Sequence, residues 1–121
     1  MDISKEIARL KALPEFTENV GMVLVHNGVV RGWSRQSHDA VEYLEVVPDH
    51  ARIEELRQEF LKRPGIFTIV IEALEGRFQP GDDLLFIIVA GALREDVKPV
   101  LAELLDRVKA EAVTKKEIVS G

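Results

Sequence analysis

The stretch that most restricts the fold is the apolar run from Leu84 to Ala90, LLFIIVA, which contains no charged residue. Its length and its β-branched content favour a strand that is buried on both faces. The preceding segment, Gln79-Pro80-Gly81-Asp82, predicts a tight turn, because proline presets φ and glycine accepts positive φ. Gly91 follows the run, where it lets another backbone approach closely or lets the strand end.

The residues after this run predict a long amphipathic helix. Asp96 is the predicted N-cap, and Pro99 would then lie in the first turn, where its missing N–H costs little. Apolar residues recur at helical spacing and define one core-facing stripe: Val97, Val100, Leu101, Leu104, Leu105, Val108 and Ala112. If the helix continued, Lys109 and Lys116 would lie two turns apart, about 10 Å along one face. From spacing alone, lysines late in a helix are better explained as solvated charges that suit the helix dipole than as an anion site.

Shorter elements are predicted before the turn. They are a helix over 3–13, strands over 20–30, 41–47, 66–74 and 76–78, a polar loop over 32–40, and a helix that begins at Asp49 and ends at Pro64-Gly65. We favour a bulge at Gly28, because the apolar pattern resumes directly after it. Asp2 or Ser4 would cap the first helix, and Glu59 would pair with Arg63 in the second. The order predicts an α+β fold with helices packed on a mainly antiparallel sheet.

Length and composition indicate one ordinary globular domain over residues 1–121, with 46% hydrophobic and 31% charged residues. The net charge of −5 argues against general binding to nucleic acid. The sequence contains no cysteine, which excludes disulfides, thiolate zinc sites and a cysteine nucleophile, so that any sulfur chemistry must use sulfur from a partner. Neither a signal peptide nor a membrane-spanning run is apparent, and we expect a soluble cytoplasmic protein that does not bind membranes.

Few residues offer catalytic chemistry. The three histidines, His26, His38 and His50, do not have metal-ligand spacing, and neither a metal nor a cofactor is expected. His26 lies in an apolar strand, where a histidine is more often a hydrogen-bonded core or interface residue than a ligand. The remaining candidates are basic: Arg31, Arg35, Arg94, Lys109, Lys115 and Lys116. Each alone is usually a solvated surface charge, but together they would form a local anion site on an acidic protein.

Several motifs resemble those of the MoaE family, the large catalytic subunit of molybdopterin synthase. Gly21-x6-Gly28-x-Val30-Arg31 resembles the opening motif of the family, and Gly76-x3-Pro80-Gly81-Asp82 resembles the turn before its long apolar strand. Arg94 falls where the family has the arginine of a His-Arg pair. Lys109 and Lys116 match the spacing of two C-terminal active-site lysines, and Lys116-Glu117 resembles the family's Lys-(Lys/Arg)-Glu ending. The resemblance covers approximately residues 18–118, with the helix over 3–13 preceding it.

This resemblance implies an α/β-hammerhead fold and a homodimer within a heterotetramer. The implied partner is a small ubiquitin-like, MoaD-like sulfur carrier whose C-terminal Gly-Gly tail enters the site as a thiocarboxylate. Two sulfurs would be transferred to cyclic pyranopterin monophosphate, giving molybdopterin. A homodimer is also favoured by the long apolar strands over 20–30 and 84–90, which a second copy would cover.

The resemblance also implies roles for single residues. Arg31 and Arg94 would hold the substrate phosphate or the partner's terminal carboxylate, with Lys115 as a further substrate-binding residue. Lys109 would polarise the thiocarboxylate. Lys116 would act nearest the pterin, as a proton donor or acceptor or as an amine nucleophile.

Three departures from the family pattern keep two other functions open. Leu93 replaces the histidine before Arg94, Ala73-Leu74 replaces a second His-Arg pair, and Val113-Thr114-Lys115 replaces a Pro-aromatic-Trp segment. The first alternative is a catalytically inactive paralogue that acts as a binding or regulatory module for a ubiquitin-like partner. The second is a small dimerisation domain without a ligand, in which the basic residues are scattered on the surface.

Overall fold

The apolar run forms the central strand of the molecule, as predicted. In the computed structural model, which describes residues 1–120, this strand is β5 (Asp83–Gly91), and each of its residues after Asp83 is buried. It pairs antiparallel with β1 (Met22–Val29) on one side and with β3 (Ile66–Ala73) on the other, which gives a three-stranded sheet in the order β1-β5-β3. The predicted bulge is confirmed, because the β1–β5 register shifts between Gly28 and Val29.

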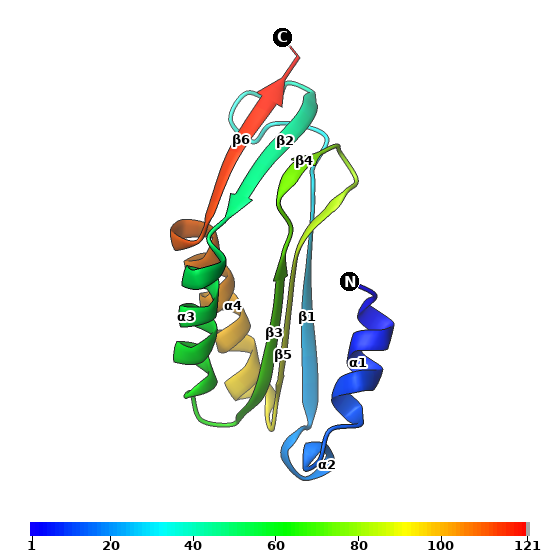
Figure 1. Cartoon of the computed structure of the whole chain (residues 1–121), viewed down its shortest axis with the longest axis vertical. Helices are drawn as coiled ribbons and strands as arrows, with labels where there is room; N and C mark the ends of the chain where they lie inside the picture. The colour runs from blue at the N-terminus through cyan, green and yellow to red at the C-terminus, as the bar shows by residue number, and fades with distance from the viewer. Residues whose placement is uncertain (121) are drawn as a thin grey trace.

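Helices cover both faces of this sheet (Figure 1). α3 (His50–Leu61) and α4 (Arg94–Glu111) lie on one face, and α1 (Ile3–Lys11) with the short α2 (Phe16–Asn19) lies on the other. Side chains of β5 alternate between two hydrophobic clusters: Ile87 packs with α3 and α4, while Ile88 packs with Leu10 and Phe16. An apolar residue is therefore needed at every position of the run, rather than at alternate positions.

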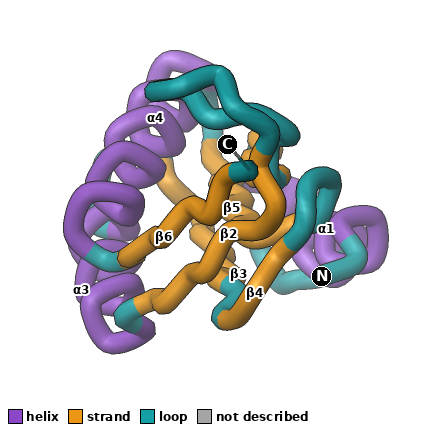
Figure 2. The backbone as a smooth tube through the Cα atoms, turned by 90° about the horizontal axis from the view of Figure 1, so that it is seen from above, coloured by secondary structure: helices purple, strands orange, loops and turns teal. Residues whose placement is uncertain are grey.

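A second sheet extends beyond the ends of α3 and α4 (Figure 1). It consists of β4 (Gly76–Phe78), β2 (Val41–Pro48) and β6 (Val113–Val119), in the order β4-β2-β6, with antiparallel pairing throughout. Figure 2 shows these three strands side by side in front of the first sheet. The predicted α+β class with helices on antiparallel sheets is confirmed.

The strand β6 corrects the prediction that the chain ends in a helix. α4 ends at Glu111, and the residues from Val113 onward pair with β2 along most of its length. Lys109 and Lys116 therefore do not lie two turns apart on one helix. Pairing with a distant strand outweighed the helical alternative, which β-branched residues such as Val113 and Thr114 already disfavour.

Three local predictions at the helices are also corrected. The N-cap of α4 is Leu93 and not Asp96, so that Pro99 lies in the second turn. The Asp96 carboxylate instead approaches Gly65, where a Cβ would lie 2.2 Å from its Oδ2. Glu59 pairs with Arg107 of α4 rather than with Arg63. By contrast, the predicted caps Asp2 and Asp49 each accept a hydrogen bond from a backbone N–H of their helix.

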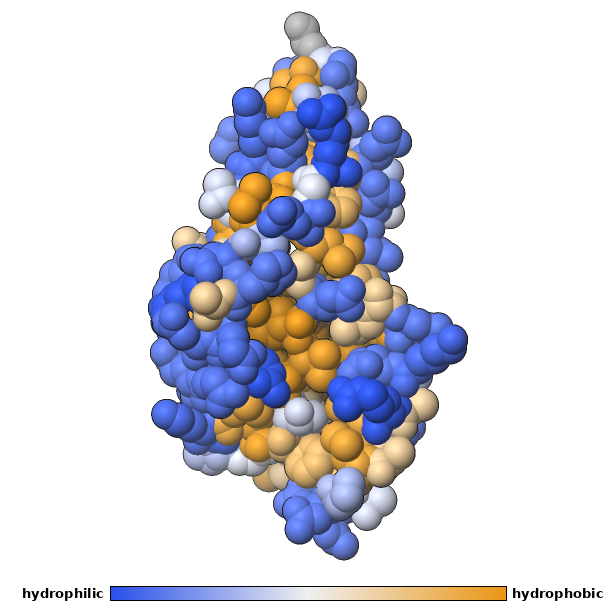
Figure 3. Space-filling view, viewed as in Figure 1, coloured by the Kyte–Doolittle hydropathy of each residue, from blue (hydrophilic) through white to orange (hydrophobic). Residues whose placement is uncertain are grey.

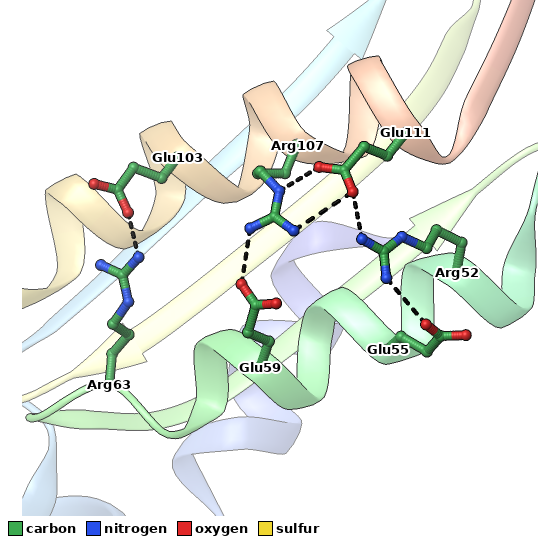
Figure 4. A network of polar contacts seen from close by, with 7 residues as sticks. All are labelled: Arg52, Glu55, Glu59, Arg63, Glu103, Arg107 and Glu111. Atoms are coloured by element: carbon green, nitrogen blue, oxygen red, sulfur yellow. Dashed lines mark hydrogen bonds and ion pairs between the residues drawn. The ribbon is translucent and has the colours of Figure 1, made fainter.

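A network of ion pairs joins α3 to the end of α4 (Figure 4). Glu111 accepts hydrogen bonds from Arg107 and Arg52, and Arg107 also donates to Glu59 at 2.8 Å. A separate ion pair joins Arg63, which follows the end of α3, to Glu103 of α4. The hydrogen bonds from Arg107 and Arg52 lower the pKa of Glu111 to about 2. The network thus holds the last turns of α4, on which Lys109 lies.

On the face seen in Figure 3, an apolar strip is exposed between the polar surfaces of α1 and α3. The edge strand β3 runs there, and its residues are half-buried except for Ile69. Among residues 1–120, no helix has both the length and the apolar character that crossing a bilayer requires.

Candidate anion-binding site

A cavity of about 800 Å³ lies where β1, the end of α4, β6 and the segment after β1 meet. Buried apolar residues line part of it: Val30, Val41, Leu44 and Leu84. The titratable residues around it are His26, Arg31, Arg35, Asp39, Lys109, Lys115 and Glu117. This combination of an apolar lining with several convergent polar groups is typical of a ligand site.

The register of β6 decides which of its side chains face the cavity. Lys115 and Glu117 pair with Val46 and Leu44 of β2, both of which are buried in the core. Directly paired residues share a face of the sheet, so Lys115 and Glu117 lie on the core side and line the cavity. Lys116 pairs with Glu45 and lies on the opposite face, away from the cavity, although all three side chains are exposed.

Arg31 enters the cavity directly after β1, and contacts with its own loop hold it there. Its Nε donates a hydrogen bond to the carbonyl oxygen of Trp33 at 2.9 Å, and its guanidinium lies 4.6 Å from the centre of the Trp33 ring. The indole in turn stacks on His38, with ring centroids 5.4 Å apart. A bridge between Trp33 and Ala40 closes this loop. The geometry limits the positions that the Arg31 side chain adopts.

The cavity is locally positive on a chain whose net charge is −5. Four cationic side chains, Arg31, Arg35, Lys109 and Lys115, outnumber the two carboxylates that line it. Partial burial, followed by the charges of Lys109 and Arg31, lowers the pKa of Lys115, while Glu117 opposes the shift. The cavity therefore suits a small anion, and the Lys115 amine gives up its proton more readily than an ordinary lysine does.

His26 lines this cavity, although the sequence did not single it out as a site residue. Sequence reasoning favoured a hydrogen-bonded core or interface histidine, but its Nε2 atom is buried and has no hydrogen-bonding partner within residues 1–120. Burial and then the charges of Lys109 and Lys115 lower its pKa. The only indication in the sequence was a single imidazole in an otherwise apolar strand.

The structure brings together three of the five predicted site residues, Arg31, Lys109 and Lys115. Arg94 begins α4, fifteen residues before Lys109, which places it roughly 22 Å away along the helix axis. Its exposed side chain pairs with Glu95 at 3.3 Å and does not line the cavity. Lys116 is also outside the cavity.

A comparison with protein families matches residues 2–111 of the chain to the MoaE protein family. The chain belongs to the MoaE family. The matched segment contains Arg31, Arg94 and Lys109, and it ends before Lys115 and Lys116. The resemblance seen in the sequence motifs is thus confirmed, whereas the resemblance around the second lysine lies outside the matched segment.

Solved MoaE structures have the same fold. Molybdopterin synthase from Staphylococcus aureus is 26% identical, with a TM-score of 0.77 over 95% of this chain and 84% of that one. Molybdopterin cofactor biosynthesis protein E from Burkholderia multivorans ATCC 17616 is 27% identical, with a TM-score of 0.77 over 99% and 82%.

A more distant neighbour comes from the complex of subunits 1 and 2 of the molybdopterin-converting factor of Helicobacter pylori 26695. It is 15% identical, with a TM-score of 0.71 over 98% of this chain and 80% of that one, a likeness that shows the fold alone. A comparison with curated proteins by sequence gives no match. Family membership and the S. aureus and B. multivorans structures support a part in molybdenum cofactor biosynthesis.

Proposed function

We propose that this chain is the large subunit of a molybdopterin synthase, a sulfurtransferase that acts on cyclic pyranopterin monophosphate. The sulfur would come from the C-terminal thiocarboxylate of a small ubiquitin-like subunit. The observation that carries the proposal is the convergence of Arg31, Lys109 and Lys115 on one cavity. The phosphate of the pterin and the tail of the partner are both anions, and both suit a cavity of this charge. The lack of cysteine is consistent with sulfur that arrives on a partner.

In this proposal Arg31 binds the phosphate or the partner's terminal carboxylate, and Lys109 polarises the thiocarboxylate. Two residues are candidates for the second amine. Lys116 matches the spacing of the family lysine, while Lys115 faces the cavity and has a lowered pKa. The geometry favours Lys115 as the amine that moves protons during sulfur transfer.

The proposed partner is a small sulfur-carrier subunit that ends in Gly-Gly. The H. pylori neighbour comes from a complex of two subunits of the molybdopterin-converting factor, and we extend that assembly to this chain as a proposal. A Gly-Gly tail has no side chains, so it can extend past the exposed Val29 and Val119 at the cavity while its terminal charge meets the amines.

We also propose a homodimer, and we keep the cytoplasm as the expected location. The half-buried apolar residues of β3 lie on an open sheet edge, which a second copy would cover (Figure 3). Arg94 would have to act on the cavity of a second copy, since its distance along α4 keeps it from the cavity of its own chain. Light scattering at micromolar concentration tests this proposal, and a monomer at that concentration contradicts it.

A catalytically inactive binding module is the second candidate. It is favoured by Leu93, which is 58% exposed where the family usually has a histidine, and which offers no hydrogen-bonding group. The synthase predicts that product forms and the binding module predicts that it does not, whereas both predict that the small subunit binds.

The deciding experiment mixes the chain with a thiocarboxylated small subunit and the pterin precursor, and measures the dithiolene product. Product formation that is lost in Lys109→Ala supports the synthase. Binding of the small subunit without product supports the binding module. If a Gly-Gly-ending subunit does not bind at all, both candidates are wrong.

A further inference from the structure

His26 differs from the other polar residues of the cavity because its Nε2 atom has no hydrogen-bonding partner. Among residues 1–120, this atom is the one buried side-chain nitrogen or oxygen without such a partner. Buried polar groups are nearly always paired, because removing them from water without compensation costs free energy. An unpaired nitrogen beside a cavity is therefore a group to be explained.

The alternation of β1 directs this ring towards the cavity. Met22 and Leu24 pack with the cluster that contains α3 and α4, whereas Val23 and Val25 pack with the cluster under α1. His26 follows Leu24 at the strand period of two and lines the cavity. It thus faces the end of α4.

Gly28, the next residue on this face, leaves room for the imidazole. A Cβ at Gly28 would lie 3.1 Å from Nε2 of His26, which is tighter than ordinary van der Waals contact. Gly28 also lines the cavity. Any side chain at this position would crowd the nitrogen and fill the space beside it.

Charged groups face the cavity from three elements around His26. They are Lys109 from α4, Lys115 and Glu117 from β6, and Arg31, Arg35 and Asp39 from the segment after β1. Lys109 and Lys115, after burial, favour the neutral imidazole. A neutral ring still carries one N–H, so it can donate to an anion without repelling the two amines. Once an anion lies between these groups, its charge favours the imidazolium.

We propose that the His26 ring turns on anion binding, so that its buried Nε2 donates a hydrogen bond to the oxyanion that enters this cavity, and that the ring takes up one proton from solvent as the anion binds. The identity of the anion rests on the proposed function. It is either the terminal carboxylate or thiocarboxylate of the partner, or the phosphate of the pterin. His26 is then a ligand-contacting residue of the site, and it couples anion affinity to pH.

The test is an NMR titration of the three histidines in the full chain, with His26 assigned from the His26→Phe spectrum. It is carried out alone, with inorganic phosphate, and with N-acetyl-glycylglycine, whose one charge is its terminal carboxylate, and the two anions distinguish the phosphate from the carboxylate. We expect the pKa of His26 to lie below the ordinary histidine value and to rise when one anion is added. His50, which does not line the cavity and begins α3, serves as the internal control. His38 is not used as a control, because it stacks on Trp33, which contacts Arg31.

Calorimetry in two buffers of different ionisation enthalpy measures proton uptake directly. Near pH 6, wild type takes up more protons than His26→Phe on binding the same anion, and the difference between the two proteins is the share of His26, because phosphate exchanges protons of its own in both. Phe preserves the ring and removes the donor, and we expect affinity to fall about tenfold. His26→Gln, whose amide N–H reaches a similar position, recovers part of the affinity without the additional proton uptake of wild type.

The outcomes separate this inference from the proposed function. Anion binding that depends on Lys109, while the pKa of His26 and the affinity of His26→Phe stay unchanged, overturns the inference and leaves the synthase possible. The inference is also wrong if neither anion binds at tens of millimolar, and turnover then decides the function separately. A His26 response without turnover supports the inference and contradicts the synthase. If His26→Phe does not fold, His26→Gln assigns the resonance and the wild-type titration still decides.

Discussion

The two sheets of this molecule differ in burial and in what they carry. The sheet β1-β5-β3 has helices on both faces, and its central strand is fully buried after its first residue. The sheet β4-β2-β6 extends beyond the helices, and most residues of β6 are exposed. Two of the charged cavity residues, Lys115 and Glu117, come from this second sheet.

The comparison shows that apolar burial and the charged residues of the cavity are concentrated in different parts of the molecule. Burial of apolar side chains in the first sheet supplies stability, while the second sheet and the end of α4 hold charged groups at a partly solvated edge. Because ionisable groups are costly to bury, a cluster of four cations has to lie where water still reaches it. The predictions below test this separation, in order of decreasing effect.

The largest effect is expected in the core of the first sheet. Ile87 is 0% exposed in β5, and Ile87→Ala should lower the free energy of unfolding by about 2–5 kcal/mol, through lost burial and a residual cavity. Val47 of β2 is 57% exposed, and Val47→Ala should change it by less than about 0.5 kcal/mol. Urea denaturation of both variants measures the difference. Similar losses in the two variants would contradict the separation.

Removal of the Lys109 amine should greatly reduce product formation and leave the free energy of unfolding unchanged. If the proposed function is right, Lys109→Ala should reduce product formation by roughly 100-fold or more, because the amine would then act on the reacting group. The midpoint of urea denaturation should stay at the wild-type value, because Lys109 is exposed. A Lys109→Ala protein that is active but unstable would show that the residue supports the fold and not the reaction.

A smaller effect should distinguish the two faces of β6. Lys115→Ala should lower product formation by about tenfold or more, and Lys116→Ala by less than about twofold, because Lys115 lines the cavity and Lys116 lies on the opposite face. Parallel turnover assays measure both. A larger loss in Lys116→Ala than in Lys115→Ala would support the assignment made from the family spacing. It would mean that β6 changes register or that these two lysines act in the cavity of another copy.

The smallest effect concerns the network between α3 and α4. The folded-state pKa of Glu111 is about 2, below the ordinary value of 4.5, so its contribution to stability is complete above about pH 4.5 and is lost as the pH falls through about 2. Glu111→Gln should therefore lower the melting temperature slightly at pH 7, and the difference from wild type should vanish near pH 2.

Thermal unfolding at pH 7, 4 and 2 measures this difference. Glu42→Gln, an exposed carboxylate on β2, is the control and should have little effect at any of these pH values. A difference that persists at pH 2 would mean that Glu111 acts through packing rather than through charge.

The elements with strong local patterns were predicted well. Leu84–Ala90 and the apolar face of α4 follow from the spacing of apolar residues, and the caps Asp2 and Asp49 follow from local hydrogen bonding. Long-range contacts account for the errors. Glu59 was assigned to a partner four residues away, but the approach of α4 brings Arg107 to it instead.

For the site, the sequence by itself determined which residues are present: an acidic chain without cysteine, motifs that resemble those of the MoaE family, and the basic residues Arg31, Lys109 and Lys115. Only the tertiary structure decided which of them meet. The pairing of β6 with β2 turns Lys115 to the cavity and Lys116 away, and the length of α4 separates Arg94 from Lys109. The physical reason is that a one-residue change in strand register reverses every side chain, and register depends on a distant strand that no local pattern specifies.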